Sequence, residues 1–136
     1  MRIGFTCSAF DLLHAGHILM LKEAKAHCDW LVVGLQTDPT IDRPSKNKPV
    51  QSITERFIQL SAVKYVDEVI VYATEADLID VLKSYPINVR FIGEEYKDIN
   101  FTGKQYCVDN NVDIHYNRRQ HSFSTTDLRN RVMNCR

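Results

Sequence analysis

Residues 2–35 read RIGFTCSAFDLLHAGHILMLKEAKAHCDWLVVGL, and this stretch decides the fold. It begins with an apolar run of strand length over residues 2–7 and passes through an irregular turn into a segment of helical period over residues 16–28. It ends with an unbroken apolar run over residues 30–35, which is typical of a strand buried on both faces. The order strand, helix, strand therefore predicts a parallel sheet covered by helices.

The rest of the chain continues this alternation. Further strands are predicted over residues 68–72, 88–92 and 112–116, with helices starting at Ile53 and near Ser124 and spanning residues 75–85 and 103–109. Residues 37–52 hold three of the four prolines and show little periodicity, which is typical of a long functional loop. We therefore expect one α/β domain over residues 1–136, a Rossmann-like open parallel sheet of about five strands with helices on both faces.

The composition excludes several classes of partner. Lys and Arg number 17 and Asp and Glu number 17, so no net charge draws the chain to nucleic acid or to a membrane surface. No apolar run approaches the roughly 20 residues of a membrane-spanning helix, and we expect no secretory signal because the chain runs straight into a strand-like segment without a basic and apolar leader pattern. The four cysteines are scattered without a CxxC pair, which favours reduced thiols. We expect a cytoplasmic protein that inserts into no membrane and binds no nucleic acid.

The turn after the first strand carries the strongest functional signal. In an open α/β sheet, ligands bind beyond the carboxyl ends of the strands, and residues 10–17 occupy such an end. His14 and His17 stand at the start of a helix, where free backbone N–H groups and the helix dipole favour phosphate. Gly16 lets the backbone approach a ligand closely. The same histidines also fit metal ligands or surface and capping residues, although no cysteine or carboxylate lies nearby in a zinc-binding spacing.

Three segments together resemble one enzyme family. Residues 10–17, FDLLHAGH, resemble the HxGH signature of the cytidylyltransferase family of nucleotidyltransferases, and residues 119–126, RQHSFSTT, resemble its second signature, RTxGISTT. Between them, residues 64–69, KYVDEV, resemble the family's RYVDEV segment and follow Glu55-Arg56. The segments occur in the family's order along nearly the whole chain, at spacings similar to those of the glycerol-3-phosphate cytidylyltransferases.

The chain departs from the family pattern around the nucleotide and the acceptor. Ser8-Ala9 stands where the family has Gly-Thr, so the threonine hydroxyl near the triphosphate is missing unless Ser8 replaces it. Other replacements affect the second signature, the acidic pair after the fourth strand and the RYVDEV segment: Gln120, Ser122, Phe123, Glu94-Glu95 and Lys64. These changes leave the chemistry in place and weaken the assignment of the substrate.

The resemblance implies the transfer of CMP from CTP to a small phosphorylated acceptor, with glycerol 3-phosphate as the first choice and pyrophosphate as the leaving group. It implies that His14 and His17 stabilise the α-phosphate and that Arg119 helps to hold the β- and γ-phosphates. A catalytic lysine is expected in the 37–52 loop, at Lys46 or Lys48. The nucleotide would also contact residues around the strand ends and at the start of the last helix: Ser8, Ala9, Phe10, Asp11, Gly16, Gly93, Glu94, Ser124, Thr125 and Thr126.

The resemblance also implies an acceptor site, a cofactor and an oligomer. The acceptor would contact Asp11, Lys46, Arg56, Lys64 and Asp67, although Arg56 and Asp67 also fit a structural ion pair. Mg²⁺ is the expected cofactor, with Asp11 as its protein ligand, directly or through water. A homodimer is expected through the segment 56–67, where Phe57, Ile58 and Tyr65 exceed the apolar residues that one helical face needs.

Two alternatives to this reading stay open. The acceptor could be another polyol phosphate, or a sugar, amino-acid or choline-type phosphate, and the nucleotide could be ATP or GTP. A nucleotide-binding module without catalysis is a different class of protein. The presence of both histidines, Arg119 and the Ser-Thr-Thr triplet at 124–126 argues against that class.

Overall fold

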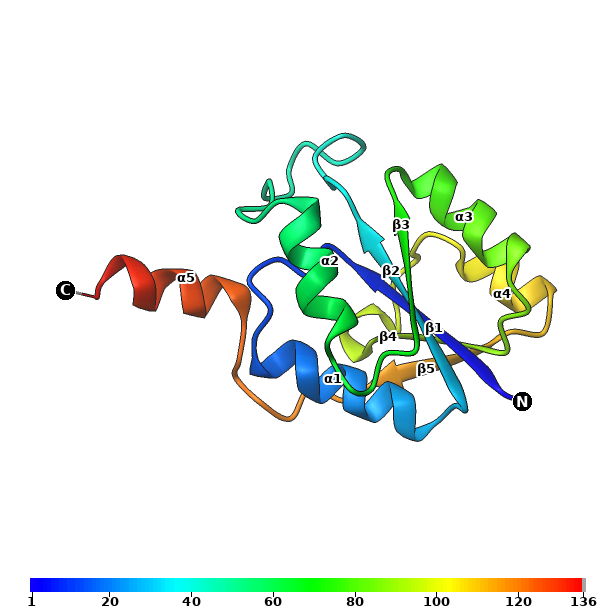
Figure 1. Ribbon diagram of the computed structural model, residues 1–136. Helices are drawn as coiled ribbons and strands as arrows, with labels where there is room; N and C mark the ends of the chain where they lie inside the picture. Colours follow the sequence, from blue (N-terminus) through cyan, green and yellow to red (C-terminus); the bar gives the residue numbers. More distant parts are fainter. Residues whose placement is uncertain (136) are drawn as a thin grey trace.

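The computed structural model describes residues 1–135, which form one five-stranded parallel sheet with helices on both faces (Figure 1). In spatial order the strands are β3 (Glu68–Tyr72), β2 (Trp30–Gln36), β1 (Ile3–Ser8), β4 (Val89–Gly93) and β5 (Asp113–Asn117). The helices are α1 (Ala15–Ala26), α2 (Ile53–Ser61), α3 (Glu75–Ser84), α4 (Lys104–Asp109) and α5 (Thr125–Met133). A short 3₁₀ helix, η1 (Glu94–Tyr96), follows β4; three residues are too few for sequence periodicity to indicate it. The predicted fold class is confirmed.

Two apolar clusters hold the helices against the sheet, one on each face. The first joins α1 and α2 to β2 and β4 and includes the fully buried Leu21 and Leu60. The second joins α3 to β1 and β2 and includes Leu78. Successive residues of β2 alternate between the clusters, with Val33 in the first and Val32 in the second. This is the physical reason why the β2 sequence is apolar without a break.

The central strand β1 marks the point where the strand order reverses. The chain runs from β1 to β2 and β3 on one side, and then places β4 and β5 on the other side of β1. Connections that lead away from adjacent strands in opposite directions leave a crevice above the carboxyl ends of those strands. The fold therefore positions a binding site between the ends of β1 and β4.

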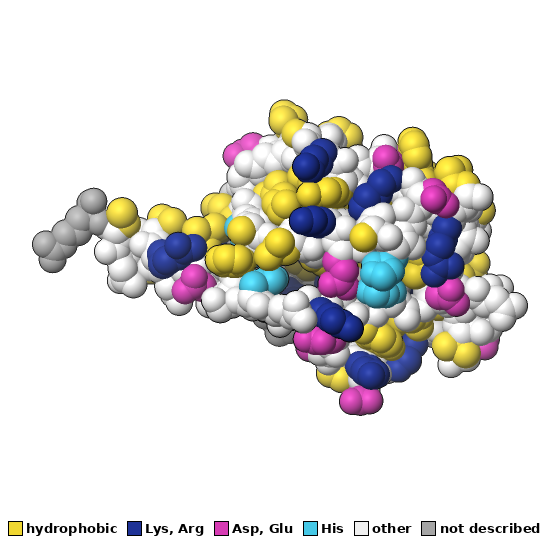
Figure 2. Space-filling model, turned by 90° about the horizontal axis from the view of Figure 1, so that it is seen from below, with side chains coloured by type: hydrophobic (Ala, Val, Ile, Leu, Met, Phe, Trp, Pro, Cys, Tyr) yellow, Lys and Arg dark blue, Asp and Glu magenta, His cyan; other side chains and the backbone are white. Residues whose placement is uncertain are grey.

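The last helix, α5, extends away from the sheet (Figure 1). Its N-cap is Ser124, whose hydroxyl accepts a hydrogen bond from the backbone N–H of Asp127 at 3.0 Å, so the serine half of the predicted capping box is present. In Figure 2 the same helix also extends from the body of the molecule. On the face in view, acidic and basic side chains are interspersed and do not form separate patches. None of the helices within residues 1–135 is long and apolar enough to cross a membrane.

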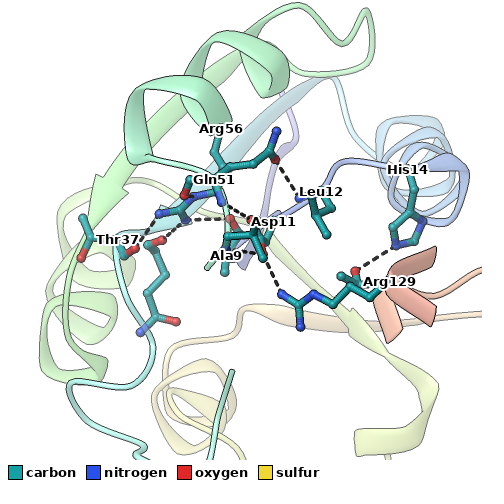
Figure 3. Close-up of polar contacts among 11 residues, drawn as sticks. Ala9, Asp11, Leu12, His14, Thr37, Gln51, Arg56 and Arg129 are labelled. Atoms are coloured by element: carbon teal, nitrogen blue, oxygen red, sulfur yellow. Dashed lines mark hydrogen bonds and ion pairs between the residues drawn. The ribbon is translucent and has the colours of Figure 1, made fainter. Parts of the chain in front are cut away.

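Arg56 fastens the start of α2 to the carboxyl ends of β1 and β2 (Figure 3). Its side chain is 2% exposed. The guanidinium donates to four backbone carbonyls: Nη1 to Ala9 (2.9 Å) and Gln36 (2.6 Å), Nη2 to Thr37 (2.6 Å) and Nε to Gln51 (3.2 Å). A buried polar group that loses its hydrogen-bond partner costs about 1–3 kcal/mol. Arg56 therefore holds three separate segments in place.

We predict that Arg56→Met, which removes the donors but keeps most of the side-chain length, lowers the free energy of unfolding by about 3–5 kcal/mol. Arg131→Met is the matched control, because the Arg131 side chain is 67% exposed and its ion pair with Asp127 contributes less than about 1 kcal/mol. Urea unfolding at pH 7 measures both variants. A loss below about 1 kcal/mol in Arg56→Met would contradict the anchoring role, since such a loss is typical of an exposed arginine.

Candidate active site

A cavity of about 780 Å³ opens above the carboxyl ends of β1 and β4, and its volume suits a small ligand. Its walls come from the β1–α1 turn, the 37–52 loop, the segment after β4, and the residues before and within α5. Most of the predicted catalytic and nucleotide-binding residues line this cavity: Ser8, Ala9, Phe10, Asp11, His14, Gly16, His17, Lys46, Gly93, Arg119, Ser124, Thr125 and Thr126. The structure thus brings together segments that are more than 100 residues apart in the sequence.

The β1–α1 turn holds two non-glycine residues in the left-handed region. Phe10 has a φ of 48° and Leu12 a φ of 51°, conformations that residues with a side chain adopt only when their surroundings impose them. The Phe10 side chain is fully buried in the cluster beneath α1, and the Leu12 N–H donates to Gln51 Oε1 at 2.8 Å. The turn is therefore held in a strained shape beside the cavity.

His14 and His17 cap α1 and also face the cavity. His14 Nδ1 accepts from the Gly16 N–H at 3.0 Å, and His17 Nδ1 accepts from the His14 N–H at 3.1 Å. Because both Nδ1 atoms accept, the proton of each neutral ring lies on Nε2, and His14 Nε2 donates to Thr125 Oγ1 at 3.1 Å. The capping role considered from the sequence is thus present, and it fixes the tautomers that make both rings hydrogen-bond donors at Nε2.

Both imidazoles favour the neutral form. The pKa of His17 is lowered to about 4, chiefly by burial and then by the neighbouring His14, while the charge of Asp11 opposes the shift. Burial also lowers the pKa of His14, with further contributions from His121 and Arg119. A polyanion placed beside these rings would raise both pKa values, because a negative charge favours the protonated form.

Gly16 has no room for a side chain. A Cβ atom there would lie 2.8 Å from His14 Cε1 and 3.0 Å from His121 Cε1. We expected Gly16 to leave space for a ligand beside the backbone. In the structure two imidazoles occupy that space. The glycine allows a third histidine, from the segment before α5, to lie at the start of α1.

The carboxylate of Asp11 anchors the groups around it (Figure 3). It is buried and accepts from the N–H groups of Val50 (2.8 Å) and Gln51 (2.9 Å) and pairs with Arg129 Nη2 (2.8 Å). Burial would raise the pKa of Asp11, but these three donors outweigh it and lower the pKa. Within residues 1–135 there is no group of three or more His, Cys, Asp or Glu side chains that could hold a metal ion. Binding of Mg²⁺ by Asp11, directly or through water, stays a prediction.

One face of α5 is tied to the β1–α1 turn. Thr125 bonds His14, and Arg129, four residues later, reaches Asp11. Residues four apart share a helix face, so a single face makes both contacts. Arg119 lines the cavity beside this helix start. The cations and hydroxyls predicted to hold the triphosphate therefore surround one region.

In two pairs of like residues, one member lines the cavity and the other does not. Lys46 lines the cavity, whereas Lys48 does not. Glu95 also lines it, whereas Glu94, the predicted nucleotide contact, accepts a hydrogen bond from the Arg119 backbone N–H at 3.1 Å. The sequence alone could not tell which member of each pair lines the cavity. Two like residues close together in an irregular segment differ only in the direction of their side chains, and no repeat in the sequence indicates that direction.

Three residues predicted to bind the acceptor are not brought to the cavity wall. Arg56 is occupied by the four carbonyls described above. Lys64 and Asp67 lie before β3, at the amino-terminal edge of the sheet, where Asp67 Oδ2 pairs with Lys25 Nζ (2.6 Å) and accepts from the Leu31 N–H (2.8 Å). An ion pair between Arg56 and Asp67 does not form either, because the two side chains bond partners at opposite edges of the sheet.

The predicted dimer interface is only partly exposed. Phe57 and Ile58 are 41% and 64% exposed on α2, whereas Tyr65 packs against the first apolar cluster. The homodimer stays a prediction.

The cavity also contains residues that the motifs did not indicate. Arg90 and Asn117 line it from within β4 and from the end of β5, and they are only 3% and 4% exposed. The available signal was a charged residue inside the apolar run Val89-Arg90-Phe91, since arginine is rarely buried without a partner. For Arg129 the available signal was its position four residues after Thr125, which places both residues on one face of the last helix.

The chain shares its family with known proteins. The profile of the family described as cytidylyltransferase-like matches residues 5–131. The chain belongs to the cytidylyltransferase-like family. Among curated members, it is 36% identical over 127 residues to the bifunctional protein HldE of Rhodospirillum rubrum and 40% identical over 96 residues to that of Acidiphilium cryptum. These alignments cover 93% and 70% of this chain but 25% and 20% of the relatives, so the chain spans a quarter or less of their length.

Solved structures share the fold of this cytidylyltransferase-like chain. A lipopolysaccharide core biosynthesis protein from Thermoplasma volcanium superposes with a TM-score of 0.73 at 27% identity, covering 89% of this chain and 99% of that one. Pantothenate synthetase from Thermus thermophilus gives a TM-score of 0.68 at 11% identity, covering 94% and 61%. The second likeness shows a common fold alone.

We predict that His17→Asn, whose amide oxygen can still accept from the His14 N–H, flattens the pH dependence of stability between pH 6.5 and 4. The unfolded His17 titrates near its ordinary pKa of about 6.5 and the folded residue near 4, so in this window the unfolded state holds the extra proton. Wild-type stability therefore rises with pH from 4 and reaches its full value above 6.5, with a slope from this residue of up to about 1.4 kcal/mol per pH unit. Urea unfolding at pH 7, 6, 5 and 4.5 gives the difference, and parallel profiles for variant and wild type would contradict a depressed pKa.

Proposed function

We propose that this protein transfers a nucleoside monophosphate from a nucleoside triphosphate to the phosphate of a sugar phosphate, with release of pyrophosphate. The main support is that His14, His17 and the start of α5 meet at one cavity, at the switch point of the sheet. Membership of the cytidylyltransferase-like family supports the reaction type.

The proposed chemistry needs no protein nucleophile. An oxygen of the acceptor phosphate attacks the α-phosphorus, a new P–O bond forms, and the bond to the bridging oxygen of the β-phosphate breaks as pyrophosphate leaves. The protein contributes by positioning two anions and by stabilising the charge of the crowded phosphorus. In this scheme the Nε2–H of His17 donates to the α-phosphate, while Arg119 and the N-terminus of α5 hold the leaving phosphates.

A sugar phosphate is proposed as the acceptor in place of glycerol 3-phosphate. The likeness to a lipopolysaccharide core biosynthesis protein supports this choice, because such a core is built from sugars. The cavity is also lined by Asn100, whose amide can bind hydroxyls, and by Glu75, whose carboxylate can accept further hydrogen bonds beside its ion pair with Arg43. A sugar was among the acceptor classes that the sequence left open.

The nucleotide and the metal remain parts of the proposal. CTP was the expectation from the sequence and ATP or GTP the alternative, and we propose that the donor is CTP or ATP. Mg²⁺, when bound, would screen the triphosphate charge. We propose that it is held by the nucleotide's own phosphates, since Asp11 has its oxygens engaged by three donors.

A screen for pyrophosphate release tests the proposal. The purified protein is assayed with each common ribonucleoside triphosphate, Mg²⁺, and a panel of sugar 1-phosphates together with glycerol 3-phosphate. We expect release that depends on the acceptor and is fastest with a sugar phosphate, and His17→Asn should lower kcat by about 10²–10³ because one transition-state donor is lost. Release without an acceptor, or faster release with glycerol 3-phosphate than with any sugar phosphate, would contradict the proposal.

Lys46 and Lys48 form a matched pair within one loop. We expect Lys46→Ala to lower kcat by at least about tenfold, since Lys46 lines the cavity and a charge near the developing negative charge stabilises it. Lys48→Ala should stay within about twofold of wild type, and both variants should keep the wild-type melting temperature because exposed charges add little to folding. Steady-state kinetics with the best substrate pair measures the contrast, and equal effects of the two substitutions would remove Lys46 from the catalytic set.

A further inference from the structure

Arg90 is a buried cation at the wall of the cavity. It is 3% exposed and lies under the loop that leads to α4. Its Nη1 donates to the Thr102 carbonyl, its Nη2 lies 3.9 Å from Cys7 Sγ, and its guanidinium carbon lies 4.9 Å from the centre of the Phe101 ring. Its Nε is buried and makes no hydrogen bond with residues 1–135. One donor of the guanidinium is therefore unused.

The groups that contact Arg90 are uncharged in their usual state. The thiol of Cys107 faces it as well, and no carboxylate within residues 1–135 forms an ion pair with it. A cation taken out of water without a counter-ion is unfavourable by several kcal/mol. Since Arg90 lines the cavity, an anionic ligand there would supply the missing counter-charge.

Arg90 and the histidines reach the cavity from opposite faces of the sheet. His14 and His17 stand at the start of α1, on the face of the first apolar cluster. Arg90 lies on the other face, beside Cys7 and Leu82 of the second cluster. A nucleotide whose phosphates lie against the histidines and α5 leaves the side of Arg90 free. Two phosphates entering from two faces would meet above the end of β1, as an in-line transfer requires.

We propose that Arg90 binds the phosphate of the acceptor and holds it for attack on the α-phosphorus. This inference rests on the proposed function and assigns the acceptor's place within the same cavity. Glu75, whose Oε1 pairs with Arg43, and Asn100, in the loop that covers Arg90, also line the cavity. Their carboxylate and amide are in position to bind hydroxyls of a sugar whose phosphate Arg90 holds.

A KM comparison tests this role in the active enzyme. Arg90→Met removes the charge, Arg90→Lys keeps it, and Arg2→Met is the control because Arg2 pairs with Asp113 at the amino-terminal edge of the sheet. We expect Arg90→Met to raise the KM of the acceptor about tenfold or more, the loss of a charge-assisted hydrogen bond, with the KM of the nucleotide within about twofold. Arg90→Lys should recover part of the loss. An equal rise of both KM values, or an unchanged acceptor KM, would overturn the assignment.

Inorganic phosphate gives a second readout that needs no turnover. In the ¹⁵N-labelled wild-type protein, the Nε–H resonance of Arg90, identified by its absence from the Arg90→Lys spectrum, should shift on titration with phosphate. The apparent Kd of phosphate from thermal-shift titration should rise about tenfold in Arg90→Met and stay unchanged in Arg2→Met. A resonance that does not move at saturating phosphate would overturn the proposal even if Arg90→Met fails to fold. If no substrate pair turns over, the proposed function fails, and the phosphate titration still decides the role of Arg90.

Discussion

The carboxylate of Asp11 and the guanidinium of Arg56 hold the carboxyl edge of the sheet in one shape. Arg56 gathers the ends of β1 and β2 and the residue before the N-cap of α2, through four carbonyls. Asp11 gathers two N–H groups of the 37–52 loop and the side chain of Arg129 on α5. Together the two charges satisfy backbone groups at the end of β2 and in the irregular segments beside it. These contacts hold walls of the cavity in place.

This constraint has consequences for the chemistry. The turn that carries Asp11 also carries Phe10 and Leu12 in left-handed conformations, and it delivers His14 to the N-cap of α1. The two half-buried histidines then lie beside one another, and partial burial lowers the pKa of both rings. Although the chain has no net charge, cationic side chains gather along the cavity: Arg43, Lys46, Arg90, Arg118, Arg119 and Arg129. A local field of this kind can hold two phosphorylated ligands without a global one.

Apolar period and turn chemistry were enough to predict the strands, the helices and their faces, because burial on one or both sides leaves a repeat in the sequence. The segments that line the cavity could also be predicted from the sequence, because the carboxyl ends of parallel strands meet at one edge of the sheet. The roles of Asp11 and Arg56 could not be read in this way. Both act on backbone groups up to 47 residues away or on a side chain 118 residues away, and such contacts leave no local pattern.

In the segment 64–69, a motif suggested a role in ligand binding, whereas the structure shows contacts away from the cavity. Its resemblance to a family segment suggested acceptor binding, yet Asp67 bonds Lys25 and the Leu31 N–H at the far edge of the sheet. These contacts hold the segment against α1 and β2, and acceptor binding by it stays a prediction. The cavity is instead lined by Arg90 and Asn117, buried polar side chains that sequence motifs did not single out.

The central claim is that an acceptor phosphate oxygen attacks the α-phosphorus of the nucleotide at this site. The most direct test uses the best acceptor from the pyrophosphate screen with ¹⁸O in its phosphate group, and ³¹P NMR of the product. The account predicts one ¹⁸O in the bridge between the two phosphorus atoms, seen as an isotope shift on both resonances, and pyrophosphate free of label. A nucleotide-derived phosphorus without an isotope shift, or label in the pyrophosphate, would contradict it.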